Sequence, residues 1–251
     1  MVTNFFEQLS HLYDPREAAA IVRRYTEDCG ELTAEAMSRL LDGEPVQYII
    51  GATDFYDRRF LVNPSVLIPR GETEELVRYV IEDLGTKYAG TIIDVGTGSG
   101  AIAVTLASEL PLSKLTAVDI SSDAINVAAK NCMINDVYLN LQELNILKST
   151  DLSFDVVVSN PPYITGGERV FMHKNVLDYE PSLALFVQDD DPLLFYREIA
   201  SRINCNKIYY EINQQFGAQV VELLESLSYV DVHIIKDLNG HDRICTARRA
   251  R

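Results

Sequence analysis

Residues 91–110, TIIDVGTGSGAIAVTLASEL, decide the fold of this chain. A short run rich in β-branched residues leads into a glycine-rich turn at 96–100, and an apolar helical pattern follows from Ala101. A short β-branched run bounded by glycines is typical of a buried strand, and the longer run after the turn is typical of a helix. The stretch therefore predicts a strand, a tight turn and a helix that packs against a sheet.

The same alternation continues to the end of the chain. Further strands are expected at 115–119, 138–143, 154–160, 207–212, 229–237 and 242–249, and helices at 122–132, 192–203 and 216–227. Apolar β runs alternating with amphipathic helices predict an open, mostly parallel α/β sheet. The last two strands are joined by a short turn around Asn239-Gly240, which predicts an antiparallel hairpin.

The first seventy residues have a different pattern. Pro15 suits the first turn of a helix, and Thr33 can cap a second helix that runs to Leu41. Between 45 and 62 the residues become aromatic and β-branched, and DFYDRRFLV predicts a β-hairpin. We therefore expect a helical N-terminal domain at 1–44, a hairpin linker at 45–70 and an α/β domain at 71–251, with its first helix near 73–84.

The composition excludes several classes of protein. The chain has 251 residues, 47% of them hydrophobic, which is enough for a packed core. Its 22 Lys and Arg against 37 Asp and Glu give a formal charge of −15, so no direct binding of nucleic acid is expected. The four cysteines form no C-x-x-C pair, and the four histidines lack metal-ligand spacing. With no secretory signal and no membrane-spanning run, we expect a cytoplasmic protein that binds no metal and no membrane.

The glycine turn is the first candidate site. Gly96-Thr97-Gly98-Ser99-Gly100 has the spacing G-x-G-x-G rather than the G-x-G-x-x-G of dinucleotide folds. Asp119 ends the next strand, where its carboxylate could accept hydrogen bonds from both hydroxyls of a ribose. Asn145 follows the third strand, at a place that can contact an adenine. The simpler alternatives are a plain tight turn, a helix cap at Asp119 and an ordinary turn residue at Asn145.

Asn160-Pro161-Pro162-Tyr163, at the end of the strand FDVVVSN, is the most specific feature. A residue before proline is pushed to extended geometry, and prolines donate no N–H, so this loop offers carbonyls and one side-chain amide. Asn160 Oδ1 and the Pro161 carbonyl could accept both N–H bonds of an –NH₂ group, while Tyr163 covers its plane. This arrangement favours methylation of an amide or aryl amine, and a simple Pro-Pro turn is the alternative. The thirty residues that follow lack periodicity, which is typical of a lid or binding loop.

Taken together, these motifs resemble the HemK-type protein-(glutamine-N5) methyltransferases. The likeness covers nearly the whole chain, and the parts that carry it are PVQYIIG (45–51), VLIPR (66–70) with Glu72-Thr73-Glu74, DVGTGSGAIA (94–103), AVDIS (117–121), SNPPYI (159–164), DYEP (178–181) and KDLNGHDR (236–243). Gly71, Asn145 and Asn213 depart from the residues typical of the family, which are proline, an aromatic or apolar residue and glycine.

The resemblance implies a Rossmann-like, class I S-adenosylmethionine (SAM)-dependent methyltransferase domain with a seven-stranded sheet, and an N-terminal domain for substrate recognition. Gly96 to Gly100, Asp119, Asn145 and Asn160 would surround SAM or its product S-adenosylhomocysteine. Asn160 to Tyr163 would hold the substrate, the glutamine of the Gly-Gly-Gln loop in bacterial peptide chain release factors.

Three other functions compete with this prediction. A methyltransferase for a glutamine of a ribosomal protein would use the same loop and differ in the N-terminal domain. A DNA amino-methyltransferase would need a basic target-recognition region, which the charge of −15 disfavours. A cofactor-binding module without catalysis would have no need of the intact Asn160-Pro-Pro-Tyr loop.

Overall fold

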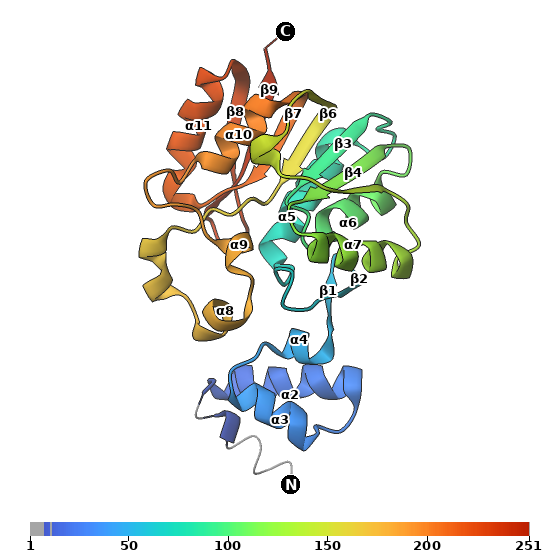
Figure 1. Ribbon diagram of the computed structural model, residues 1–251, viewed down its shortest axis with the longest axis vertical. Helices are drawn as coiled ribbons and strands as arrows, with labels where there is room; N and C mark the ends of the chain where they lie inside the picture. Colours follow the sequence, from blue (N-terminus) through green and yellow to red (C-terminus); the bar gives the residue numbers. More distant parts are fainter. Residues whose placement is uncertain (1–7, 11, 251) are drawn as a thin grey trace.

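The computed structural model describes residues 8–10 and 12–250. The N-terminal helices form one end of an elongated molecule, and a larger α/β domain forms the other (Figure 1). A short helix and a two-stranded hairpin connect the two parts. The division into domains at 1–44, 45–70 and 71–251 stays a prediction.

Two helices of the N-terminal part are α2 (Pro15–Cys29) and α3 (Ala34–Leu41). Asp14 Oδ1 accepts hydrogen bonds from the first amides of α2, at 2.8 and 3.0 Å, and Thr33 Oγ1 accepts one from Ala36 N at 3.1 Å. These side chains satisfy N–H groups that a helix start leaves without partners, so Pro15 and Thr33 begin the helices as predicted. The helices share a small core of their own around Leu40 and Met37.

The linker contains the predicted hairpin and a helix that the sequence pattern did not predict. Strands β1 (Ala52–Phe55) and β2 (Arg58–Leu61) pair antiparallel, and α4 (Val46–Ile50) precedes them. The aromatic and β-branched residues of α4 are weak helix formers. Tertiary contacts override that preference, because the Tyr48 hydroxyl donates to the Val66 carbonyl at 2.6 Å and the ring is buried.

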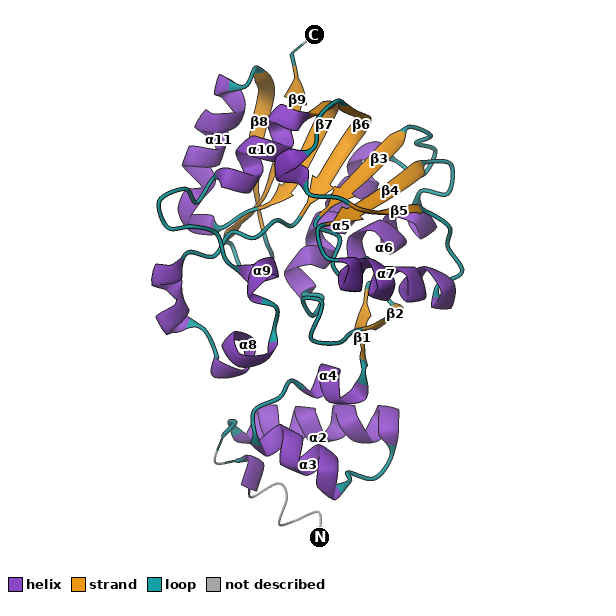
Figure 2. Ribbon diagram, in the orientation of Figure 1, coloured by secondary structure: helices purple, strands orange, loops and turns teal. Residues whose placement is uncertain are grey.

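A seven-stranded sheet forms the centre of the α/β domain (Figure 2). Its order is β5-β4-β3-β6-β7-β9-β8, and all neighbours are parallel except those of β9, which runs antiparallel to both β7 and β8. The strands are β3 (Thr91–Val95), β4 (Lys114–Asp119), β5 (Asn140–Glu143), β6 (Leu152–Ser159), β7 (Ile203–Glu211), β8 (Tyr229–Lys236) and β9 (Asp242–Arg249). This confirms the mostly parallel sheet and the final antiparallel hairpin.

Helices cover both faces of the sheet (Figure 2). The main ones are α5 (Gly71–Leu84), α6 (Ala101–Glu109), α7 (Ser122–Ile134), α10 (Leu194–Arg202) and α11 (Gly217–Ser226). Alternate residues of a strand face opposite sides, so Ile92 packs with α5 and α6, whereas Ile93 packs with α10 and α11. Among the described helices, none is both long and apolar enough to cross a membrane.

Strands β3 and β6 form the centre of this sheet. From β3 the chain order runs outward through β4 and β5, and from β6 it runs outward through β7 on the other side. The carboxyl ends of β3 and β6 are adjacent, because Val95 pairs with Ser159. Ligands of open α/β sheets bind at this kind of switch point. The glycine turn and Asn160, which directly follow these two strands, therefore lie side by side.

The segment that follows β6, residues 160–191, is called the long segment below. It contains short helices only. These are η2 (Gly166–Phe171), α8 (Lys174–Tyr179) and α9 (Ser182–Leu185), and a parallel bridge pairs Ile164 with Phe186. Helices of one turn or so give no recognisable period, which explains why the sequence showed none. The segment folds back toward the N-terminal helices and lies between them and the sheet (Figure 1).

Candidate active site

The glycine turn joins β3 to α6 in a left-handed conformation that suits glycine. Gly98 has φ +54, and a Cβ on Gly100 would come within 3.1 Å of Ala128 Cβ on α7. The N–H groups of Gly96, Thr97, Gly98 and Gly100 all donate within the protein, to Val118, Asp119 and Thr97 oxygens. With four of its five N–H groups used within the protein, the turn suits a nucleoside better than a phosphate.

Asp119 ends β4 beside this turn. Its Oδ2 accepts from Gly98 N at 2.9 Å and its Oδ1 accepts from Ser121 N at 3.0 Å. Each carboxylate oxygen has two acceptor sites, so these bonds orient the side chain and leave capacity for a ligand. The carboxylate is half-buried and lines the cavity described below.

Asn145 lies at the end of the neighbouring strand β5, where it begins the short helix η1 (Ile146–Lys148). Its Oδ1 accepts from Leu147 N at 2.9 Å, so the side chain is a helix cap, and it also lines the cavity. This local role agrees with the simpler alternative, in which Asn145 is an ordinary turn residue. Contact with an adenine remains a prediction.

Asp94 is a buried carboxylate directly beneath the glycine turn. Its Oδ2 accepts from Thr97 Oγ1 at 2.6 Å, and the backbone N–H of Ala103 also favours the charged form, although no donor within residues 8–10 and 12–250 reaches full hydrogen-bond geometry with Oδ1. Burial raises the pKa of Asp94 to about 7, and the nearby Asp119 charge adds to the increase. A nearby positive charge would favour the ionised form of Asp94 and lower its pKa.

A cavity of about 350 Å³ lies over the carboxyl ends of β3, β4, β5 and β6. The glycine turn, Asp119, Asn145 and Asn160 all line it, together with Arg70. Its volume is in the range of sites for small ligands. The structure thus brings the sequence-predicted residues for the cofactor and the turn at Asn160 to one cavity.

Asn160-Pro161-Pro162-Tyr163 leaves β6 at the rim of this cavity. Asn160 Nδ2 donates to Thr73 Oγ1 of α5 at 3.1 Å, so the amide nitrogen is held by a neighbouring helix. The Tyr163 hydroxyl donates to Glu211 Oε1 at 3.0 Å. Burial raises the pKa of Tyr163, and the Glu211 charge raises it further, so the hydroxyl stays protonated.

Glu211 connects both ends of this turn. It ends β7 with only 2% of its surface exposed, and Thr73 Oγ1 donates to its Oε2 at 2.6 Å. Burial raises the pKa of Glu211, while the hydrogen bonds from Thr73 and Tyr163 and the charge of Arg243 lower it. Asn160, Thr73, Glu211 and Tyr163 therefore form one continuous hydrogen-bonded chain.

A second cavity, of about 310 Å³, shares Asn160, Pro161 and Arg70 with the first. Its other walls come from Tyr163, Glu211 and the long segment, with apolar side chains such as Val176 and Leu185. The Asn160-Pro161 peptide thus borders two adjoining cavities, and a ligand in each would meet there.

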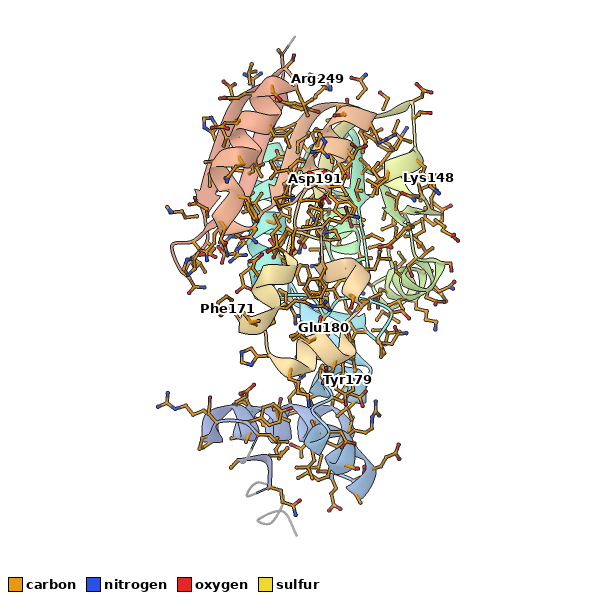
Figure 3. The ribbon with its side chains drawn as sticks, turned by 60° about the vertical axis from the view of Figure 1, so that its left-hand side comes forward. Lys148, Phe171, Tyr179, Glu180, Asp191 and Arg249 are labelled. Atoms are coloured by element: carbon orange, nitrogen blue, oxygen red, sulfur yellow. The ribbon has the colours of Figure 1, made fainter. Side chains whose placement is uncertain are left out.

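The long segment is held in place by an ion pair whose carboxylate is buried. Arg70 Nη2 donates to Glu180 Oε1 at 2.5 Å, and Glu180 Oε2 accepts from Ile68 N at 3.2 Å. The preceding Tyr179 donates its hydroxyl to the Asp42 carbonyl at 3.1 Å. Figure 3 shows Tyr179 next to the N-terminal helices and Glu180 closer to the sheet. These contacts tie the linker, the N-terminal helices and the long segment together around the second cavity.

Four residues around the cavities were not predicted as site residues from the sequence. They are Arg70, Thr73, Glu180 and Glu211. One sequence feature could have identified Glu211. It directly follows the aromatic strand residues Tyr209-Tyr210, at the carboxyl end of a parallel strand. The other three belong to stretches that carried the family resemblance, yet no local pattern indicates where their side chains go.

Comparison with known proteins supports the likeness seen in the sequence. A model of the methyltransferase small domain matches residues 70–178. Release factor glutamine methyltransferase of Flavobacterium psychrophilum is 46% identical over 216 residues, covering 82% of this chain and 76% of the relative. The enzyme of the same name from Bacteroides thetaiotaomicron is 44% identical, with 84% of this chain and 78% of the relative covered.

Solved structures support the fold. A 16S rRNA N2 methyltransferase of Thermus thermophilus, in complex with AdoMet and guanosine, superposes with a TM-score of 0.58 at 16% identity over 79% of this chain and 50% of its own. A methyltransferase of Pyrococcus furiosus gives 0.55 at 17% identity over 87% and 100%. These similarities establish the class I methyltransferase fold. Relatives that are more than 40% identical over most of their length show that this chain belongs to the family of release factor glutamine methyltransferases.

Proposed function

We propose that this protein transfers a methyl group from SAM to the side-chain amide nitrogen of the glutamine in the Gly-Gly-Gln loop of bacterial peptide chain release factors. The observation that carries the proposal is the Asn160-Pro161 peptide at the junction of two cavities, one bordered by the glycine turn and Asp119. The relatives of this chain that are release factor glutamine methyltransferases support the assignment of the substrate.

The residues that line the first cavity fit SAM chemically. Asp119 offers carboxylate oxygens to ribose hydroxyls, and the glycine turn allows close approach of the methionine part. When bound, SAM supplies an electrophilic methyl group on a positively charged sulfur.

The turn at Asn160 would hold the acceptor amide. An amide nitrogen is a poor nucleophile because its lone pair is delocalised into its carbonyl. Asn160 Oδ1 and the Pro161 carbonyl would accept its two N–H bonds, fix its orientation and stabilise the positive charge that develops on nitrogen. Placing that nitrogen roughly 3–3.5 Å from the methyl carbon would supply much of the acceleration.

The second cavity suits the rest of a glutamine side chain. Val176 and Leu185 provide apolar walls for its methylene groups, and the Tyr163 ring would exclude water from the amide plane. A side-chain carboxylate would be rejected, because it has no N–H to offer the two acceptor oxygens and would lie beside the buried Glu211 charge.

The test is to incubate the protein with SAM and a purified bacterial release factor, and to map methylation by mass spectrometry. We expect one added methyl group, on the Gly-Gly-Gln glutamine. The Asn160→Ala variant should bind SAM as tightly as the parent but transfer at most about one hundredth as fast. Methylation of any other residue, or of none by a protein that binds SAM, would refute the assignment of the substrate.

A further inference from the structure

We propose that Glu211 is a positioning residue: acting through Thr73, it determines which end of the Asn160 side-chain amide faces the acceptor. The inference deepens the proposed function and rests on it for its catalytic consequence. The arrangement of hydrogen bonds around Asn160 can be tested separately.

Glu211 is placed where it can do this. It ends β7, the strand next to β6, and Asn160 directly follows β6. Thr73 lies in the first turn of α5 and is 5% exposed, so water does not compete for its hydroxyl. The three side chains form a chain of two hydrogen bonds, 2.6 Å from Thr73 to Glu211 and 3.1 Å from Asn160 to Thr73.

The direction of these bonds follows from counting protons. An ionised carboxylate only accepts hydrogen bonds, so the single hydroxyl proton of Thr73 must be donated to Glu211. The hydroxyl oxygen can then only accept from Asn160. It therefore selects the –NH₂ end of the amide and turns Oδ1 the other way.

This selection matters because the two ends of an asparagine amide have nearly the same shape. Without an orienting partner, the amide could present –NH₂ to a substrate –NH₂ group, and two donors would face each other. When the hydrogen bonds from Asn160 to Thr73 and from Thr73 to Glu211 are both present, Oδ1 of Asn160 faces the acceptor. It can then accept an N–H bond from the substrate amide.

Burying the Glu211 carboxylate costs folding free energy, and a role in orienting Asn160 would explain why a carboxylate is nevertheless present. Its carboxylate makes no ion pair within 4 Å in the described part of the chain, and its side-chain partners are two neutral hydroxyl groups, those of Thr73 and Tyr163. A buried carboxylate without an ion pair generally lowers stability relative to an apolar residue. Perturbed buried carboxylates beside a cavity are typical of functional sites.

Steady-state kinetics of four variants test the catalytic part. Glu211→Gln can donate an N–H to Thr73, which frees the hydroxyl proton to point at Asn160, and Thr73→Val removes the hydroxyl. We expect each to lower kcat roughly tenfold or more, with KM for the release factor and the Kd for SAM within about threefold of the parent. Thr73→Ser keeps the hydroxyl and should restore kcat to within about threefold. The double variant Glu211→Gln/Thr73→Val should be far less impaired than the product of the single effects, because both act on one path.

Neutron diffraction from deuterated crystals tests the arrangement without relying on methyl transfer. In the parent protein we expect two deuterons on the Asn160 atom that faces Thr73, and one deuteron of Thr73 pointing at Glu211. Glu211→Gln should reverse or mix the orientation of the Asn160 amide. Melting temperatures of all variants identify any that fail to fold, and Thr73→Ser serves as the conservative reference.

The outcomes separate the two proposals. If the oxygen of Asn160 faces Thr73 in the parent, or if Glu211→Gln keeps kcat within twofold, Glu211 does not orient the amide. If the deuterons lie as expected but the parent methylates no glutamine, the orientation stands and the proposed function is wrong.

Discussion

Arg70 and Glu180 lie 110 residues apart in the chain, yet the Arg70 guanidinium donates to the Glu180 carboxylate across 2.5 Å. The Glu180 side chain is 1% exposed, whereas that of Arg70 is 36% exposed. Arg70 lines both cavities, so the pair fixes one wall of the site to the part of the long segment between α8 and α9. Breaking this pair should therefore affect stability and the acceptor cavity together.

We expect Arg70→Ala to lower the free energy of unfolding by about 2–4 kcal/mol, because it leaves the Glu180 carboxylate buried without its charged partner. Urea denaturation measures the change. The double variant Arg70→Ala/Glu180→Gln should recover part of the loss, since the unpaired charge is gone. Arg16→Ala, at an exposed position of α2, is a matched control expected to change stability by less than about 0.5 kcal/mol. Equal stability of Arg70→Ala and the double variant would contradict this account.

Asp119→Asn should weaken SAM binding about tenfold or more, as measured by isothermal titration calorimetry. The amide keeps the shape of the carboxylate but places a donor where the Gly98 or Ser121 N–H already donates. Glu143→Gln is the matched control, because Glu143 ends the next strand in an exposed position and does not line the cavity. The prediction fails if both variants bind SAM with the affinity of the parent.

Asp94 should make the SAM-free protein less stable as the pH rises. Its folded-state pKa of about 7 is above the ordinary value of 3.8, so between these values the folded state holds a proton that the unfolded state has lost. The contribution of Asp94 to the free energy of unfolding is fully present below about pH 4. It falls as the pH rises and levels off above about pH 7, and the whole change is on the order of a few kcal/mol.

Asp94→Asn has no proton to lose, so it isolates this effect. Denaturation curves of the parent and the variant, recorded from pH 4.5 to 8, should diverge in favour of the variant as the pH rises. A constant difference in unfolding free energy across this range would show that the pKa of Asp94 is not raised.

Asn213→Gly would restore the residue typical of the resembled family. Asn213 Nδ2 donates to the Tyr163 carbonyl at 3.3 Å and to both oxygens of Glu168, at 3.0 and 3.1 Å, which ties the Asn160–Tyr163 turn to the segment behind it. Loss of these bonds should lower the free energy of unfolding by about 1–2 kcal/mol. It should also raise KM for the release factor more than it changes the Kd for SAM.

Gln215→Ala offers the comparison. Gln215 also donates to Glu168, at 3.1 Å, but this bond is exposed to solvent. We expect a smaller loss of stability and an unchanged KM. If Gln215→Ala has the larger effect, the buried amide of Asn213 is not what holds the segment.

Local patterns in the sequence determined most of the α/β fold. Strands, helices, the final hairpin around Gly240 and the first caps follow from rules that involve residues a few positions apart, and the structure has them where predicted. Helix α4 was not predicted, because burial of Tyr48 outweighs the weak helix preference of its residues, and the short helices η2, α8 and α9 were not predicted either. The turns at 96–100 and 160–163 were likewise identified from sequence, since glycine and proline restrict the backbone in recognisable ways.

Only the tertiary structure decided what surrounds these turns. Thr73 meets Glu211 across 138 residues of chain, and Arg70 meets Glu180 across 110. Such contacts depend on which strand ends and loops the sheet order brings together, and no local pattern encodes that. The sequence alone therefore determined which residues form the two turns, whereas the packing of α5 and β7 determined how the turn at 160–163 is held.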